Sequence, residues 1–154
     1  MQNKIEKQIE LQAPVARVWR ALTDYREFGA WFRVALEGPF VAGKVTRGQV
    51  LYRGFEHLVW EASIVKMEPE RLFSFTWAQI RYHDKERYSP DYAGAPRTLV
   101  EFRLEETATG TLLTVTESGF ENVPAEWREQ AMRENDGGWT AQVKNIESYV
   151  AQKR

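Results

Sequence analysis

The chain has 154 residues, with 21 Lys and Arg against 22 Asp and Glu, a formal net charge of −1 and no cysteine. This length fits one ordinary domain, so we expect a single domain over residues 1–154. The lack of cysteine excludes disulfides, thiol nucleophiles and Cys-ligated metal sites, and the balanced charge argues against nucleic-acid binding. No apolar run approaches the roughly 20 residues that cross a bilayer, and the first twelve residues contain no signal-peptide core. We therefore expect a cytoplasmic protein that does not insert into membranes.

The first 32 residues predict a strand followed by two helices. Residues 5–11 alternate apolar and polar side chains, which is typical of a half-buried strand. Pro14 suits the first turn of a helix, and apolar residues at helical spacing continue it to about Asp24. A second short helical stretch covers residues 25–32, and we expect Gly29 to interrupt it.

The middle of the chain predicts an antiparallel sheet. Turn residues join neighbouring strands at Glu68-Pro69-Glu70 and at residues 107–110, as in hairpins. Residues 81–96 are polar and contain two prolines and a glycine, so we expect one long loop there. The strand-length runs are residues 45–52, 58–67, 71–77, 98–105 and 111–117.

The C-terminal part returns to helix. A short helix begins at Pro124, Gly137-Gly138 reads as a junction that allows close approach to the sheet, and a long helix follows. The long helix carries an apolar stripe formed by Trp139, Val143, Ile146 and Val150. This order of elements predicts an α+β fold in which a curved antiparallel sheet of six to seven strands wraps around the long C-terminal helix. A cavity between sheet and helix is the expected consequence.

Short motifs covering nearly the whole chain carry a family resemblance. They include Ala13-Pro14-Val15, Met67-Glu68-Pro69-Glu70-Arg71-Leu72, Phe75-Thr76-Trp77, Glu117-Ser118-Gly119-Phe120 and Gly138-Trp139. In this order they resemble the SRPBCC superfamily, and within it the Hsp90-ATPase-activator-like family of small bacterial proteins. The resemblance implies the START-like helix-grip fold around an internal cavity. Lipid and hormone carriers, polyketide cyclases and cochaperone domains share that fold, so the resemblance leaves the function open.

Strand parity selects candidate ligand-binding residues. Side chains two positions apart on a strand share a face, which directs Trp60, Phe75 and Trp77 inward. These aromatic side chains either fill the core or line a pocket for a flat, apolar ligand. The pocket would also include Tyr82, Trp139 and, near its mouth, Trp31, whereas Trp127 lies outside it.

Glu117 is the candidate polar residue of this interior. It shares its strand parity with Leu113 and Val115, which aims the carboxylate inward. Such a carboxylate is either a polar anchor or general acid/base for a ligand, or it reaches solvent or pairs with an arginine at the end of the strand.

The two histidines do not suggest a metal site. His57 is either a proton shuttle or, more simply, a surface residue. His83 lies with Asp84 and Glu86 in the polar loop, where the three could form a weak metal site but ordinary surface charge is the simpler interpretation. We therefore expect no metal and no cofactor.

Three functions remain. The leading hypothesis is a binding protein for a small hydrophobic molecule, aromatic or lipid-like, held in the internal cavity. An aromatase/cyclase-type enzyme would use the same cavity, with Glu117 or Tyr82 moving a proton. A cochaperone-like interaction module would instead bind a protein partner through the outer sheet face or the terminal helix.

Overall fold

Within residues 3–79 and 94–152, which the computed structural model describes, seven antiparallel strands form one sheet in the order β1-β7-β6-β5-β4-β3-β2. The strands are β1 (Lys4–Leu11), β2 (Val34–Leu36), β3 (Val45–Val50), β4 (Val59–Glu68), β5 (Leu72–Ala78), β6 (Arg97–Glu106) and β7 (Thr111–Ser118). The helices are α1 (Val15–Thr23), α2 (Tyr25–Phe32), the short 3-10 helix η1 (Phe120–Asn122) and α3 (Ala125–Gln152).

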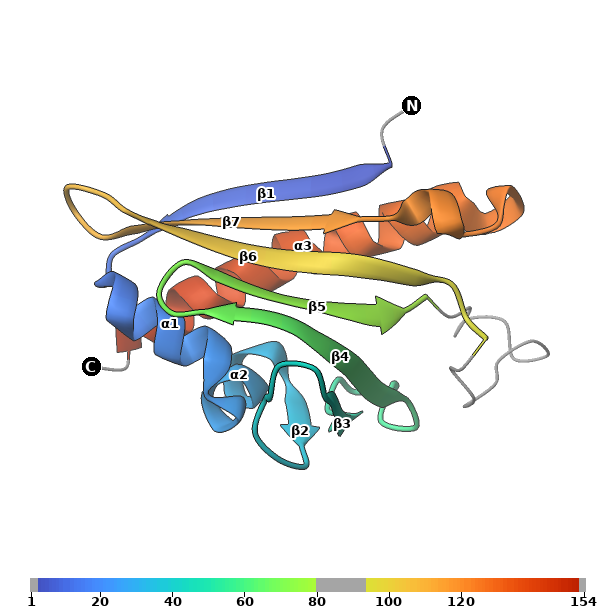
Figure 1. The fold of residues 1–154 in the computed structure, drawn as a ribbon, viewed down its shortest axis with the longest axis horizontal. Helices are drawn as coiled ribbons and strands as arrows, with labels where there is room; N and C mark the ends of the chain where they lie inside the picture. The colour runs from blue at the N-terminus through green and yellow to red at the C-terminus, as the bar shows by residue number, and fades with distance from the viewer. Residues whose placement is uncertain (1–2, 80–93, 153–154) are drawn as a thin grey trace.

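The sheet and α3 form two layers. Figure 1 shows α3 running behind the strands, from the end of β7 toward α1, while α1 and α2 lie together at one end of the sheet. This arrangement confirms the predicted α+β helix-grip fold, with the upper of the two expected strand counts. The predicted loop over residues 81–96 lies mostly outside the described residues.

Hairpins set the register of the central strands, as the turn residues predict. The β4–β5 hairpin pairs Glu68 with Leu72, and the β6–β7 hairpin pairs Glu106 with Thr111. A bulge shifts the register of β4 between Ile64 and Lys66. Strands β1 and β3 to β7 begin and end within two residues of the predicted bounds, whereas no bounds were predicted for β2.

Helix α2 continues through Gly29, contrary to the predicted interruption. Asp24 caps its N-terminus, because its side chain accepts hydrogen bonds from the backbone N–H groups of Arg26 and Glu27. A Cβ at position 29 would lie 2.4 Å from the carbonyl oxygen of Val34. Glycine is therefore needed here because β2 passes close to the helix, not because the helix breaks.

Helix α3 is one continuous helix, so the predicted junction at Gly137-Gly138 is wrong. A Cβ added at either glycine would meet no other atom within 4 Å, so neither glycine serves a close approach to the sheet. Packing on the sheet maintains the helix across both residues, since most helical stability in proteins comes from a buried face. The buried residues of this face are Ala131, Trp139, Gln142, Ile146 and Val150.

A charged cluster joins helices α1, α2 and α3. Arg17 Nη1 and Tyr149 Oη both donate hydrogen bonds to Glu27 Oε1, at 2.8 and 3.1 Å. Arg20 Nε donates to the other carboxylate oxygen at 2.7 Å. Burial and the neighbouring Glu27 carboxylate raise the pKa of Tyr149 above its ordinary value. No helix of the described ranges combines the length and apolar composition needed to cross a membrane.

Candidate functional site

Glu117 lies near the end of β7, the second strand from one edge of the sheet, and its side chain faces α3. On β7 it pairs with Ile5 of β1 on one side and with Val100 of β6 on the other. Its side chain is completely buried. The structure therefore confirms the inward direction that strand parity predicts.

Three side chains from the sheet region donate hydrogen bonds to one carboxylate oxygen of Glu117. Oε2 accepts from Thr98 Oγ1 at 2.6 Å, from Trp77 Nε1 at 2.8 Å and from Gln79 Nε2 at 3.1 Å. Thr98 is the cross-strand partner of Trp77, and Gln79 follows the end of β5. Gln79 Nε2 also donates to Thr98 Oγ1 at 2.9 Å, which links the donors to one another.

Helix α3 supplies the remaining donors. Trp139 Nε1 donates to Glu117 Oε1 at 2.9 Å, and Asn135 Nδ2 lies 3.1 Å from Oε1 and 3.0 Å from Oε2. Asn135 and Trp139 are four residues apart, so they lie on the same face of the helix one turn from each other. The carboxylate therefore joins the sheet to α3 by hydrogen bonds.

All five donors to Glu117 are neutral, and no ion pair of Glu117 occurs among the described residues. The alternative that the carboxylate reaches solvent or pairs with an arginine is therefore wrong for this part of the chain. Indole N–H groups can only donate, so both carboxylate oxygens act as acceptors. The protein's own donors engage both oxygens. The carboxylate therefore serves to hold these donor side chains in place, and it offers a ligand no free oxygen.

The indole rings of Trp77 and Trp139 stack on each other. Their centroids are 5.7 Å apart and their planes are inclined by 28°. Trp139 is buried, whereas Trp77 is only half-buried. The ring of Trp77 also contacts Phe32, Trp60 and Phe75, with centroids 5.4 to 6.1 Å away. Three aromatic residues predicted to share the site, Trp60, Phe75 and Trp77, thus lie together with Trp139.

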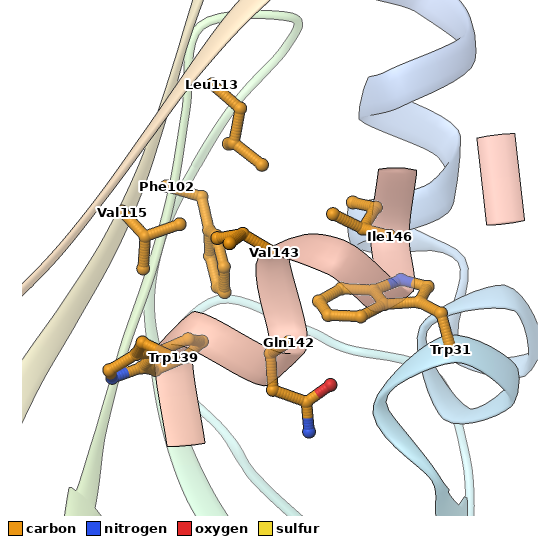
Figure 2. A pocket seen from close by; sticks show the side chains of 8 residues that line it. All are labelled: Trp31, Phe102, Leu113, Val115, Trp139, Gln142, Val143 and Ile146. Carbon is orange, nitrogen blue, oxygen red and sulfur yellow. The ribbon is translucent and has the colours of Figure 1, made fainter. Parts of the chain in front are cut away.

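A narrow gap extends from Trp139 between the sheet and α3 (Figure 2). It has about 160 Å³ of unoccupied space, and at no point is it wide enough to hold a water molecule. The strands contribute one wall, α3 a second, and Trp31 of α2 closes the far side from Trp139. The lining residues are Trp31, Phe102, Leu113, Val115, Trp139, Gln142, Val143 and Ile146.

The size of this gap decides whether it can hold a ligand, as the cavity predicted between sheet and helix would. Pockets for drug-sized ligands usually offer about 300–1,000 Å³, whereas this gap does not admit even a water molecule. In the described region, aromatic rings thus occupy most of the interior, and a ligand would have to displace one of them. Trp139 lines the gap on one side and stacks on Trp77 on the other.

Trp31 occupies a different place from the predicted mouth of the pocket. It is only 4% exposed, and its Nε1 donates to the carbonyl oxygen of Ala21 at 2.8 Å. Trp31 is therefore a fixed part of the inner wall. Trp127 is half-buried on α3 and does not line the gap.

The predictions for the polar loop fall outside the described residues. They concern Tyr82 and the group formed by His83, Asp84 and Glu86. His57 is exposed, as predicted. No group of three metal-ligating side chains occurs within residues 3–79 and 94–152.

Sequence reasoning missed the polar partners of Glu117, namely Thr98, Gln79 and Asn135. One signal was present, because Thr98 and the apolar Val100 lie two positions apart on β6 and therefore share a face of the sheet. A continuous helix would also have placed Asn135 one turn from Trp139. Gln79 lies beyond the end of β5, where no periodic pattern applies.

Comparison with solved structures identifies relatives of the same fold. The protein MLL2253 from Mesorhizobium loti is 22% identical, with a TM-score of 0.76 and coverage of 98% of both chains. The Aha1 dimer from Colwellia psychrerythraea is 16% identical, with a TM-score of 0.70, covering 97% of this chain and 96% of the other.

DynU16, a protein of the dynemicin biosynthetic locus, is 23% identical, with a TM-score of 0.73 over 98% of this chain. The present chain spans 48% of DynU16. At these identities the likeness shows the shared fold alone.

Sequence comparison assigns the family. No curated protein matches the sequence. Residues 12–151, however, match the family described as Activator of Hsp90 ATPase homolog 1-like protein. That match covers most of the chain and agrees with the helix-grip architecture. The chain therefore belongs to the Activator of Hsp90 ATPase homolog 1-like protein family.

Proposed function

We propose that this protein binds a small, flat, apolar molecule between the sheet and α3, with Trp77 and Trp139 as the main walls of the site. The observation that carries this proposal is the stacked pair of indoles, fixed by Glu117 and left half-exposed at Trp77. A hydrogen-bonded indole that keeps part of its apolar surface open is well suited to contact a ligand.

The energetics of such a site depend on apolar area. Each Å² of apolar surface removed from water contributes roughly 25 cal/mol before the costs of association. Because Glu117 orients both indoles in advance, little side-chain freedom is lost at these walls when a ligand binds. Glu117 is thus a positioning residue in this proposal, and the indoles make the contacts.

Ligand access requires a movement. The narrow gap next to Trp139 is too small for a bicyclic molecule, so binding involves a conformation in which the Trp139 or Trp77 ring turns aside. The bound state is then selected from a minor population of open molecules. We expect the observed association rate to level off at high ligand concentration, at the rate of opening.

The site favours binding over catalysis. A cyclase-type role would need a general acid or base within reach of the substrate, and both oxygens of Glu117 are engaged by donors of the protein itself. DynU16, from a biosynthetic locus, has the same fold, which is compatible with a small-molecule ligand in either role.

A protein-interaction role is the second candidate. Val45 of β3 and Val65 of β4 are 48% and 44% exposed, and Val45 pairs with Ser63, two residues before Val65. Exposed apolar side chains close together on a sheet can form part of an interface. If this face binds a partner, replacing both valines by lysine will weaken that contact and leave ligand binding in the interior unchanged.

The experiment is a titration with 2-isopropenylnaphthalene, a neutral bicyclic hydrocarbon, followed by quenching of tryptophan fluorescence. We expect saturable binding to the wild type and weaker binding to Trp77→Ala. Trp127→Ala is the matched control, because Trp127 lies outside the site, and it will bind as the wild type does. Trp77→Phe, which keeps an aromatic ring, serves as a second variant, and melting curves show which variants are folded.

Two results would contradict the proposal. One is the absence of saturable binding to the wild type. The other is equal affinity in folded Trp77→Ala or Trp77→Phe and in Trp127→Ala, which would move the ligand away from the stacked indoles.

A further inference from the structure

The indole N–H of Trp60 is buried and has no hydrogen-bond partner within the described part of the chain. Trp60 is only 7% exposed. The buried indoles of Trp31 and Trp139 both donate to an oxygen, at 2.8 and 2.9 Å. A buried donor without a partner is uncommon in folded proteins and calls for an explanation.

This unpaired donor belongs to the site of the stacked indoles. The ring of Trp60 lies 6.1 Å from that of Trp77, 5.9 Å from that of Phe32 and 5.6 Å from that of Phe75, measured between centroids. A ligand that reaches Trp77 between these rings therefore also reaches Trp60.

The chemistry of the donor restricts what can satisfy it. The indole N–H donates and cannot accept. The Trp60 ring packs against the rings of Phe28, Phe32, Phe75 and Trp77, whose side chains carry no oxygen that could accept a hydrogen bond. A molecule bound between these rings would supply the acceptor that the described residues do not.

We propose that the ligand carries a neutral acceptor oxygen, such as the carbonyl of an aromatic ketone, and that Trp60 Nε1 donates a hydrogen bond to it. This inference rests on the proposed function and narrows its ligand class. An anionic acceptor is disfavoured, because the Glu117 carboxylate is hydrogen-bonded to the neighbouring Trp77 indole and is paired with no cation in the described residues. The polar end of the ligand is therefore uncharged and accepts rather than donates.

The test compares two probes of the same shape. 2-Acetylnaphthalene has a carbonyl where 2-isopropenylnaphthalene has a methylene group, so the pair differs in the acceptor alone. We expect the wild type to bind the ketone about tenfold more tightly, the factor typical of one hydrogen bond to a buried donor. In Trp60→Phe, which lacks the N–H, this preference will fall to about one.

Phe75→Leu is the matched control. It also removes ring volume next to Trp77, but it leaves the Trp60 N–H in place. We expect both probes to bind this variant more weakly by the same factor, so that the preference for the ketone is retained. The readout is a ratio of two affinities in one variant, which general loss of packing does not change.

The outcomes separate this inference from the proposed function. If neither probe binds the wild type, the ligand site itself is wrong. If both bind the wild type with equal affinity, the site stands and the acceptor is refuted. The inference is also refuted if Trp60→Phe keeps the preference, or if Phe75→Leu loses it.

Discussion

Trp77 on β5 and Trp139 on α3 stack ring to ring and donate their indole N–H groups to different oxygens of the same carboxylate, that of Glu117. Sixty-two residues separate them in the chain, so this pair is a long-range link between the two layers of the fold. Glu117 thus fixes both the position of α3 on the sheet and the orientation of the two indoles.

Replacing Glu117 by glutamine tests this link. The variant has the same shape, but its amide NH₂ faces N–H and O–H donors, so at least one buried donor loses its acceptor. We expect the free energy of unfolding to fall by about 3 kcal/mol, measured by urea denaturation. Glu121→Gln, at an exposed position, is the control and will change stability by less than about 0.5 kcal/mol. Equal stability of the two variants would show that the hydrogen-bond network does not hold the layers together.

The buried face of α3 gives a second prediction. Ile146 is 1% exposed, and aspartate there would be a buried charge without a partner. We expect Ile146→Asp to lower the free energy of unfolding by at least about 3 kcal/mol. Ser148→Asp, two residues along and exposed, adds the same charge to the same helix as a control. A melting temperature of Ile146→Asp within a degree or two of the wild type would show that this face is not core.

Replacing glycine by alanine should have opposite effects on stability at positions 29 and 137. Gly29→Ala places a Cβ 2.4 Å from the Val34 carbonyl oxygen, and we expect a loss of about 2 kcal/mol in the free energy of unfolding. Gly137→Ala meets no atom within 4 Å inside a helix, so better helix propensity will stabilise the protein by about 1 kcal/mol. Chemical denaturation of both variants is the measurement. A destabilised Gly137→Ala would instead favour a break in α3.

The raised pKa of Tyr149 predicts a loss of stability at alkaline pH. Burial and the hydrogen bond to Glu27 favour the neutral phenol in the folded state, while Arg17 acts in the opposite direction. In the unfolded chain the phenol ionises near its ordinary pKa of about 10. The contribution of Tyr149 is therefore complete below pH 10 and is lost as the pH rises toward the folded-state pKa. Stability measured against pH should fall more steeply above pH 10 in the wild type than in Tyr149→Phe, and parallel curves would rule out this linkage.

The sheet and its inward residues were predictable because period-two patterns and hairpin residues specify them locally. Strand parity directs Trp60 and Phe75 inward, and both are buried. The continuity of α3 was not predictable in the same way. Two adjacent glycines are poor helix formers, and the packing that overrides them comes from residues distant in the sequence.

In the site, too, strand parity predicts some features, whereas others depend on contacts between residues that are distant in the sequence. Parity alone places Glu117 and Trp77 on the inner face. The carboxylate is surrounded by neutral donors from both the sheet and α3. This arrangement depends on how α3 crosses the sheet, which no local sequence pattern specifies. The unpaired N–H of Trp60 likewise becomes visible only when its neighbours are in place.

The most direct test of a ligand site between Trp77 and Trp139 is the indole N–H region of a ¹H–¹⁵N spectrum. The chain has six tryptophans, and Trp→Phe variants assign their indole signals. On titration with 2-isopropenylnaphthalene, we predict saturable shifts of the Trp77 and Trp139 signals and no shift of the Trp127 signal. Unchanged Trp77 and Trp139 signals, or a response confined to Trp127, would contradict the proposed site.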